Sequence, residues 1–96
     1  MSFTHIVTFN WKDDDFSDAP IAEALQQLVS TFDGVERYLC GPDAGFTPGA
    51  YDFAVVGTFT TREHFVHYRD HPDHKRIIDE MIAPHIANRT SVQLEH

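Results

Sequence analysis

The chain has 96 residues, 42% of them hydrophobic, with eight Phe, three Tyr and one Trp. This is enough for one small domain with an aromatic core and excludes a multidomain protein. Fifteen acidic residues against seven Lys and Arg give a formal net charge of -8, so nucleic acid and anionic membranes are unfavourable partners. The single cysteine excludes an internal disulfide, and no leader or membrane-length apolar run is present. We therefore expect a soluble, cytoplasmic protein.

The first half of the chain predicts a strand, a helix and a second strand. Apolar and polar residues alternate over residues 3–11, which is the period of a strand. Apolar residues then recur at helical spacing over residues 20–32, and Gly34 follows as a stop signal. A short strand is expected over residues 35–40. The Gly- and Pro-rich residues 41–49 predict a surface loop, which we expect to border or cover the mouth of a cavity.

The second half predicts a strand, an interrupted helix and a last strand. The strand spans residues 51–59, and the following Thr60-Thr61-Arg62-Glu63 matches a capping box, in which Thr60 and Glu63 satisfy each other's backbone amides at a helix start. Pro72 ends or kinks that helix, and a second helical piece begins at Pro72. The last strand is expected over residues 86–93.

The final Leu94-Glu95-His96 resembles the start of a vector-encoded Leu-Glu-polyhistidine tail. We therefore expect the domain to span residues 1–93 and residues 94–96 to be a remnant of an expression tag.

The order β-α-β-β-α-β predicts an α+β protomer of the ferredoxin-like type, with a four-stranded antiparallel sheet and its helices on one face. The strand over residues 51–59 is apolar on both sides, with Phe53 and Val55 on one and Ala54 and Val56 on the other. A sheet with one face in water should instead alternate between apolar and polar residues. Because no element is left to cover the second face, we expect a second copy to cover it in a two-fold symmetric homodimer.

Three segments of the chain resemble the stress-responsive A/B barrel domain family of the dimeric α/β-barrel superfamily. They are the first strand with His5, the strand Tyr51-Asp52-Phe53-Ala54-Val55-Val56, and Tyr68-Arg69-Asp70-His71-Pro72-Asp73-His74. The resemblance covers essentially the whole chain. It implies ferredoxin-like protomers whose sheets pair into a dimeric α/β barrel. It does not imply a reaction, because most members of the family have none assigned and fold alone does not determine function.

One plant member of that family is a polyketide cyclase, which closes a linear polyketide by an aldol condensation without a cofactor. Its catalytic Tyr and His match Tyr68 and His74, and its first-strand His matches His5. A further histidine of that cyclase is replaced here by Phe53. The resemblance therefore implies Tyr68, His74 and His5 as catalytic residues and no cofactor.

The residue pattern independently predicts that these three side chains point inward. His74 lies at helical spacing from Ile77 and Ile78, Tyr68 lies on the apolar side of the preceding helix, and His5 lies on the apolar face of the first strand. A neutral imidazole can remove a proton next to a carbonyl, and a phenol can bond the oxygen that gains charge. Alternatively, both histidines are core residues that bond backbone carbonyls, and Tyr68 only anchors its helix.

A metal site is the rival interpretation of this region. His67, His71 and His74 follow at i, i+4 and i+7, and Glu63 precedes His67 by four residues, so one continuous helix would present all four on one face. Because Pro72 interrupts the helix, we expect no metal. We expect the side chain of His71 to cap the end of the first helical piece.

The sequence thus predicts two alternative functions. In the first, the protein is a cofactor-independent acid–base enzyme for a small ketonic or polyketide-like molecule, with His74 as base and Tyr68 as hydrogen-bond donor. In the second, it is a non-catalytic stress-related or small-ligand-binding homodimer. An open cavity that reaches His74 favours the enzyme, whereas side chains packed against His74 favour the alternative.

Overall fold

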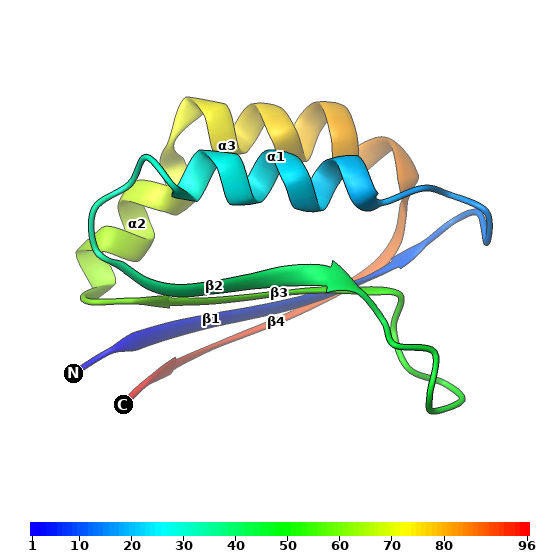
Figure 1. The fold of residues 1–96 in the computed structure, drawn as a ribbon, viewed down its shortest axis with the longest axis horizontal. Coiled ribbons are helices and arrows are strands. Elements are labelled where there is room, and N and C mark those ends of the chain that lie inside the picture. Colours follow the sequence, from blue (N-terminus) through cyan, green and yellow to red (C-terminus); the bar gives the residue numbers. More distant parts are fainter.

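The computed structural model describes residues 1–96 and has the predicted order of elements. The strands are β1 (Phe3–Trp11), β2 (Val35–Pro42), β3 (Phe53–Phe59) and β4 (Ile86–Glu95), and the helices are α1 (Ala19–Val29), α2 (Arg62–Asp70) and α3 (Pro72–Ile77), which continues as a π-helical turn (Ile78–Ile82) and a 3₁₀ turn (Ala83–His85). The sheet has the order β2-β3-β1-β4 with every neighbouring pair antiparallel. All helices lie on one face of the sheet (Figure 1). The predicted α+β, ferredoxin-like protomer is confirmed.

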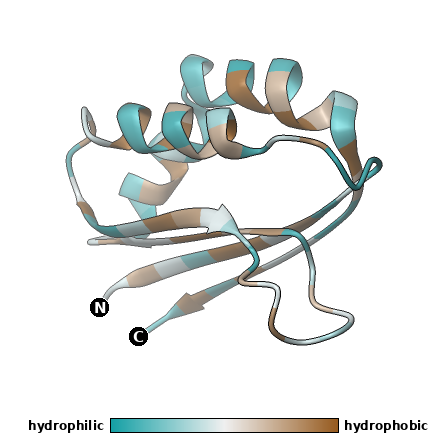
Figure 2. Cartoon of the chain, turned by 45° about the vertical axis from the view of Figure 1, so that its right-hand side comes forward, coloured by the Kyte–Doolittle hydropathy of each residue, from teal (hydrophilic) through white to brown (hydrophobic).

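Alternating burial along the two central strands builds the core between the sheet and the helices. Buried and partly exposed residues alternate along β3 and, from His5 onward, along β1, as the period of two requires. Hydrophobic and hydrophilic bands follow one another along the strand that starts at the N-terminus (Figure 2). Helix α1 packs on the same side through side chains spaced one turn apart. The core residues of these elements include Phe3, Val7, Phe9 and Trp11 of β1, Phe53, Val55 and Phe59 of β3, and Ile21, Leu25 and Val29 of α1.

Helix α2 is capped by Thr61, so the predicted capping box is wrong by one residue. The Oγ1 of Thr61 accepts a hydrogen bond from the backbone N–H of His64 at 3.2 Å. The backbone N–H and the hydroxyl of Thr60 both donate to the carbonyl of Gly34, at 2.8 and 3.3 Å. Because these bonds hold Thr60 against the turn after α1, Thr60 cannot serve as the cap, and Glu63 makes no reciprocal bond.

The interruption between α2 and α3 occurs at His71-Pro72, as predicted. The backbone of His71 is extended, which is the conformation that a following proline favours. Its Nδ1 accepts a hydrogen bond from the backbone N–H of Asp73 at 3.1 Å. The side chain of His71 therefore caps the start of α3. His71 is also the C-cap residue of α2, as expected, but through its backbone N–H, which donates to the carbonyl of Tyr68 at 3.4 Å.

The face of the sheet without helices carries a row of apolar side chains across all four strands. Val56 of β3 lies between Leu39 of β2 and Ile6 of β1, and Ile6 lies beside Val92 of β4. The side chains at the two ends of the row, Leu39 and Val92, are 50% and 49% exposed. No element of the chain covers this face (Figure 1). The prediction that β3 is apolar on both of its faces is thus confirmed.

The last strand extends past the predicted domain boundary. Leu94 pairs with Thr4, and His96 exchanges two backbone hydrogen bonds with Ser2 at 2.6 and 3.0 Å. The boundary at residue 93 and the assignment of residues 94–96 to a tag stay predictions. None of the helices has both the length and the apolar character needed to cross a membrane.

Candidate functional site

A cavity of about 240 Å³ lies between the helices and the sheet. Nine of its twelve lining residues are hydrophobic, so its polar groups are few and their positions decide what it can bind. The other three lining residues are His5 of β1, His74 of α3 and Arg89 of β4, and the aromatic wall includes Tyr68 of α2. The cavity therefore reaches all three residues that the sequence predicts to be catalytic.

The structure brings Tyr68, His74 and His5 together. The ring centroids of Tyr68 and His74 are 4.1 Å apart, and those of His5 and Tyr68 are 6.4 Å apart. All three side chains belong to buried residues. Their elements are distant in the sequence, and the break at Pro72 turns α3 so that its first turn faces the same space as the last turn of α2.

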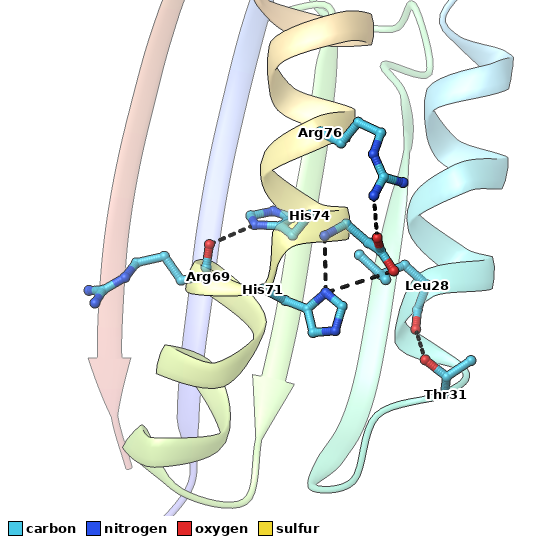
Figure 3. A network of polar contacts seen from close by, with 7 residues as sticks. Leu28, Thr31, Arg69, His71, His74 and Arg76 are labelled. Carbon is cyan, nitrogen blue, oxygen red and sulfur yellow. Dashed lines mark hydrogen bonds and ion pairs between the residues drawn. The ribbon is translucent and has the colours of Figure 1, made fainter.

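His74 is held by one hydrogen bond that leaves its other ring nitrogen free. Its Nδ1 lies 3.1 Å from the carbonyl oxygen of Arg69, in the last turn of α2 (Figure 3). Because a carbonyl only accepts, Nδ1 is the protonated nitrogen and Nε2 carries a lone pair. Burial lowers the pKa of His74 and is only partly opposed by this hydrogen bond, so the imidazole is neutral near pH 7.

His5 has the opposite tautomer. The side-chain Nε2 of Gln93 on β4 lies 2.9 Å from the Nδ1 of His5. Because an amide nitrogen only donates, Nδ1 of His5 accepts and Nε2 carries the hydrogen. Burial, the positive charge of Arg89 and the nearby His74 lower the pKa of His5 from 6.5 to about 4. His5 is therefore also neutral near pH 7 and offers an N–H donor.

The free nitrogens of both histidines contact open space. Every fully buried side-chain nitrogen or oxygen in the structure has a hydrogen-bond partner. The Nε2 atoms of His5 and His74 have none, so both contact open space, and both residues line the cavity and a hollow that adjoins it. His74 thus offers an unprotonated nitrogen, and His5 offers a protonated one.

Tyr68 is tied to a second buried tyrosine that sequence analysis missed. Its hydroxyl lies 2.6 Å from that of Tyr38 on β2. Either hydroxyl can be the donor in this bond. Burial raises the pKa of both phenols, that of Tyr68 to about 12. Tyr68 therefore stays protonated near pH 7, and its proton is available to a ligand in the arrangement in which Tyr38 donates.

Two further site residues, Gln93 and Arg89, also escaped sequence analysis. The strand β4 lacks a clear apolar alternation, so its sequence does not tell which side chains face the helices. The register does, because it pairs Gln93 with His5 and Arg89 with Phe9. Residues two apart on a strand lie on the same face of the sheet. Every second polar residue of a strand beside β1 therefore lies on the face of His5, and this was the only signal in the sequence that could have indicated Gln93 and Arg89.

The loop over residues 41–49 does not contribute to the cavity, so the expectation that it borders the mouth is wrong. None of its residues lines the cavity, and the connection between β2 and β3 extends on the side of the sheet away from the helices (Figure 1). The loop continues beyond the ends of β2 and β3. Phe46 within it is 92% exposed.

The histidines of the rival metal interpretation do not converge: His67 and His71 lie 5.5 Å apart between ring centroids, but His74 does not join them. The rings of His67 and His71 lie around Phe32, at centroid distances of 5.1 and 4.9 Å, whereas His74 turns away from His71 (Figure 3). No group of three or more His, Cys, Asp and Glu side chains is arranged to hold a metal ion.

Several solved structures share this fold. A dimeric ferredoxin-like protein of unknown function from Thermobifida fusca is 36% identical, with a TM-score of 0.86 over 98% of this chain and 90% of that chain. A dimeric protein of unknown function from Bacteroides fragilis is 22% identical, with a TM-score of 0.82 over 99% of this chain and 96% of that chain. A hydroxynitrile lyase from Passiflora edulis is 16% identical, with a TM-score of 0.76 over 97% of this chain and 91% of that chain.

No curated protein matches the chain in sequence. A family model does match it: the model described as the stress responsive A/B barrel domain covers residues 3–95. This span contains all four strands, all helices and every residue of the cavity. The chain therefore belongs to the stress-responsive A/B barrel domain family.

Proposed function

We propose that the protein is a homodimeric, cofactor-independent acid–base enzyme that removes a proton next to the carbonyl group of a short ketonic molecule. The observation that carries this proposal is the cavity of about 240 Å³ that is lined by His74, whose Nε2 has no hydrogen-bond partner and is not buried. The volume lies slightly below the range of roughly 300–1,000 Å³ typical of pockets for drug-sized ligands. It favours a short polyketide-like substrate over a long one.

His74 has the role of general base in this proposal. Its Nε2 is unprotonated and has no bonding partner in the protein, so it can take a proton from the carbon of a ligand bound in the cavity. The imidazolium that forms keeps the hydrogen bond from Nδ1 to the carbonyl of Arg69. This carbonyl belongs to the last turn of α2, where the helix dipole favours a positive charge.

Tyr68 and His5 have the role of hydrogen-bond donors. When the proton leaves the carbon, negative charge develops on the carbonyl oxygen, and fixed donors stabilise it. Tyr68 and His5 both line the cavity, and with Tyr38 as the donor in the tyrosine bond, the hydroxyl of Tyr68 and the Nε2–H of His5 are available to this oxygen. In a cyclase-like reaction, the enolate carbon then bonds to a second carbonyl carbon of the same molecule. The alkoxide formed there takes the proton back from His74, which leaves the enzyme unchanged.

The relatives support this proposal at the level of the fold. The relative from Passiflora edulis is described as a hydroxynitrile lyase, so this architecture is compatible with catalysis by a protein of similar size. At 16% identity the likeness transfers no residue role and no substrate to this chain.

The proposed homodimer rests on the uncovered face of the sheet. The row Leu39, Val56, Ile6 and Val92 crosses all four strands without a covering element. A contiguous apolar face of this kind is typical of an interface. The relatives from Thermobifida fusca and Bacteroides fragilis are both described as dimeric. We infer that two copies pair these faces, which closes the two sheets into the barrel implied by the family.

A second candidate function is the binding of a small apolar ligand without chemistry. The largely hydrophobic lining of the cavity favours it, because such a lining binds apolar molecules whether or not a proton moves. The two candidates differ in one measurable property, which is the exchange of the hydrogens next to the ligand's carbonyl group.

The test is solvent deuterium exchange of short ketones, followed by proton NMR in D₂O with 2-pentanone and 4-oxopentanoate. We expect the wild type to accelerate exchange at the carbons next to the carbonyl, and His74→Gln to slow it by about 10²- to 10⁴-fold. His67→Gln is the matched control, because His67 is an exposed histidine outside the cavity. Exchange that is no faster than in buffer, or that His74→Gln leaves unchanged, would contradict the enzymatic proposal.

A further inference from the structure

The border of the cavity along β4 is positively charged, although the protein is acidic as a whole. Arg89 lines the cavity and also a neighbouring hollow of about 230 Å³. The two hollows share His5, Tyr68 and His74, so they adjoin at the candidate catalytic groups. Neither is lined by an Asp or a Glu, in a chain whose formal net charge is -8.

Arg89 is the uncommitted cation at this border. Arg69, which lines the outer hollow, is held by Asp70, with Nε and Nη2 donating to the two carboxylate oxygens at 2.9 and 3.1 Å. Arg89 takes part in none of the ion pairs or side-chain hydrogen bonds of the structure. Its guanidinium therefore keeps all of its donors for a ligand.

The position of Arg89 suits a ligand that reaches from the surface into the cavity. Arg89 pairs with Phe9 and Gln93 pairs with His5 in the register of β4 with β1. Because β4 is an edge strand, its helix-facing side chains border the opening to solvent. Gln93 is occupied by its bond to His5, so Arg89 is the charged group that an entering molecule meets beside an apolar interior.

We propose that Arg89 binds a carboxylate of the substrate, so that the natural ligand of this cavity is a small keto acid and not a neutral ketone. The inference rests on the proposed function. A guanidinium donates two parallel hydrogen bonds to a carboxylate. An anion is repelled by most of this acidic surface, whereas at Arg89 it meets a positive group and no acidic neighbour. The carboxylate stays at the border while the ketone lies against Tyr68 and His5.

The test compares the binding of 4-oxopentanoate and of its neutral methyl ester to the full-length protein, by titration in ¹H–¹⁵N NMR spectra. We expect the wild type to prefer the acid by about tenfold or more, the effect of a hydrogen bond to a charged group. Arg89→Gln should lose this preference, and Arg89→Lys should retain part of it. Lys75→Gln, which removes one positive charge at an exposed residue outside both hollows, should change the preference less than twofold.

Equal binding of acid and ester by the wild type, an unchanged preference in Arg89→Gln, or no binding of either ligand would overturn the carboxylate site. The titration needs no turnover, so it separates this inference from the proposed function. If the acid preference depends on Arg89 but no deuterium exchange occurs, the carboxylate site stands and the enzyme proposal fails. If exchange occurs equally with acid and ester and in Arg89→Gln, the enzyme proposal stands and the carboxylate site fails.

Discussion

The two faces of the sheet are formed by the same strands but differ in what covers them. On β3, Phe53, Val55 and Phe59 face the helices and are at most 2% exposed, whereas Ala54 and Val56 alternate with them on the helix-free face and remain partly exposed. Both sets are apolar, so hydrophobicity alone does not distinguish the face that holds a cavity from the face proposed to meet a second copy.

The polar groups do distinguish the two faces. On the helix-free face, the hydroxyls of Thr4 and Thr58 satisfy each other at 3.0 Å. On the covered face, His5 and His74 each make one hydrogen bond through Nδ1 and leave Nε2 without a partner beside open space. Paired polar groups are typical of structural roles, whereas half-satisfied groups beside an open space are available for a ligand.

The largest expected effect tests the difference in packing between the faces. Phe59 is 0% exposed on the covered face, so Phe59→Ala should lower the free energy of unfolding by about 3–5 kcal/mol because it leaves a cavity in the core. Thr58→Ala, one residue away on the other face, removes one hydroxyl bond and should cost about 1 kcal/mol. Urea denaturation measures both values, and equal losses would contradict the comparison.

The second prediction concerns the helix-free face as an interface. Val56 lies inside the apolar row, so Val56→Lys would place an unpaired charge between two copies. The wild type should have twice the 11.0 kDa mass of the protomer in light scattering, and Val56→Lys should return the protomer mass. Gln27→Lys, which adds the same charge at an exposed position of α1, should leave the dimer intact. A wild type that is monomeric at micromolar concentration would rule out this interface.

Sequence reasoning succeeds where the signal is local and periodic. The alternation in β1 and the helical spacing in α1 predict both elements, and Pro72 predicts the break between α2 and α3. It also predicts that His5, Tyr68 and His74 face inward, because each lies on the apolar side of its own element. Two adjacent threonines, in contrast, are equally good caps locally, and only the contact of Thr60 with Gly34 decides between them.

The remainder of the site depends on contacts between elements that are distant in the chain. Tyr38 gains its role only because β2 lies beside β3, on which α2 packs, and Gln93 and Arg89 gain theirs from the register of β4 on β1. That register is not encoded in β4 itself, whose residues are mostly polar and exposed. The direction of the loop over residues 41–49 likewise follows from the strand ends and not from its Gly and Pro content.

The third prediction concerns the pH dependence of stability that the buried histidines of the covered face cause. The pKa of His5 falls from 6.5 to about 4 on folding, so between these pH values the unfolded chain binds a proton that the folded protein does not. Stability therefore decreases as the pH falls from 6.5 to about 4 and levels off below. After allowance for the solvent that reaches the ring, His5 should contribute about 1–2 kcal/mol to this loss. The lowered pKa of His74 acts in the same direction.

Urea denaturation at pH 7 and pH 4.5 measures this dependence. His5→Gln retains an acceptor for Gln93 and should lose less stability than the wild type between the two pH values. His67→Gln, at an exposed histidine, should behave as the wild type does. A dependence in His5→Gln as steep as that of the wild type would show that His5 does not resist protonation.

The smallest effect distinguishes the two directions of the buried tyrosine bond. Tyr38→Phe removes the 2.6 Å bond to Tyr68 and should lower the free energy of unfolding by about 1 kcal/mol, whereas Tyr51→Phe removes a hydroxyl that makes no side-chain hydrogen bond in the structure. If Tyr38 donates, its loss makes Tyr68 a weaker donor, and the deuterium exchange rate of a ketone should fall by about fivefold. If Tyr68 donated to Tyr38 instead, the substitution would release the Tyr68 proton to the cavity, and the rate would stay constant or rise.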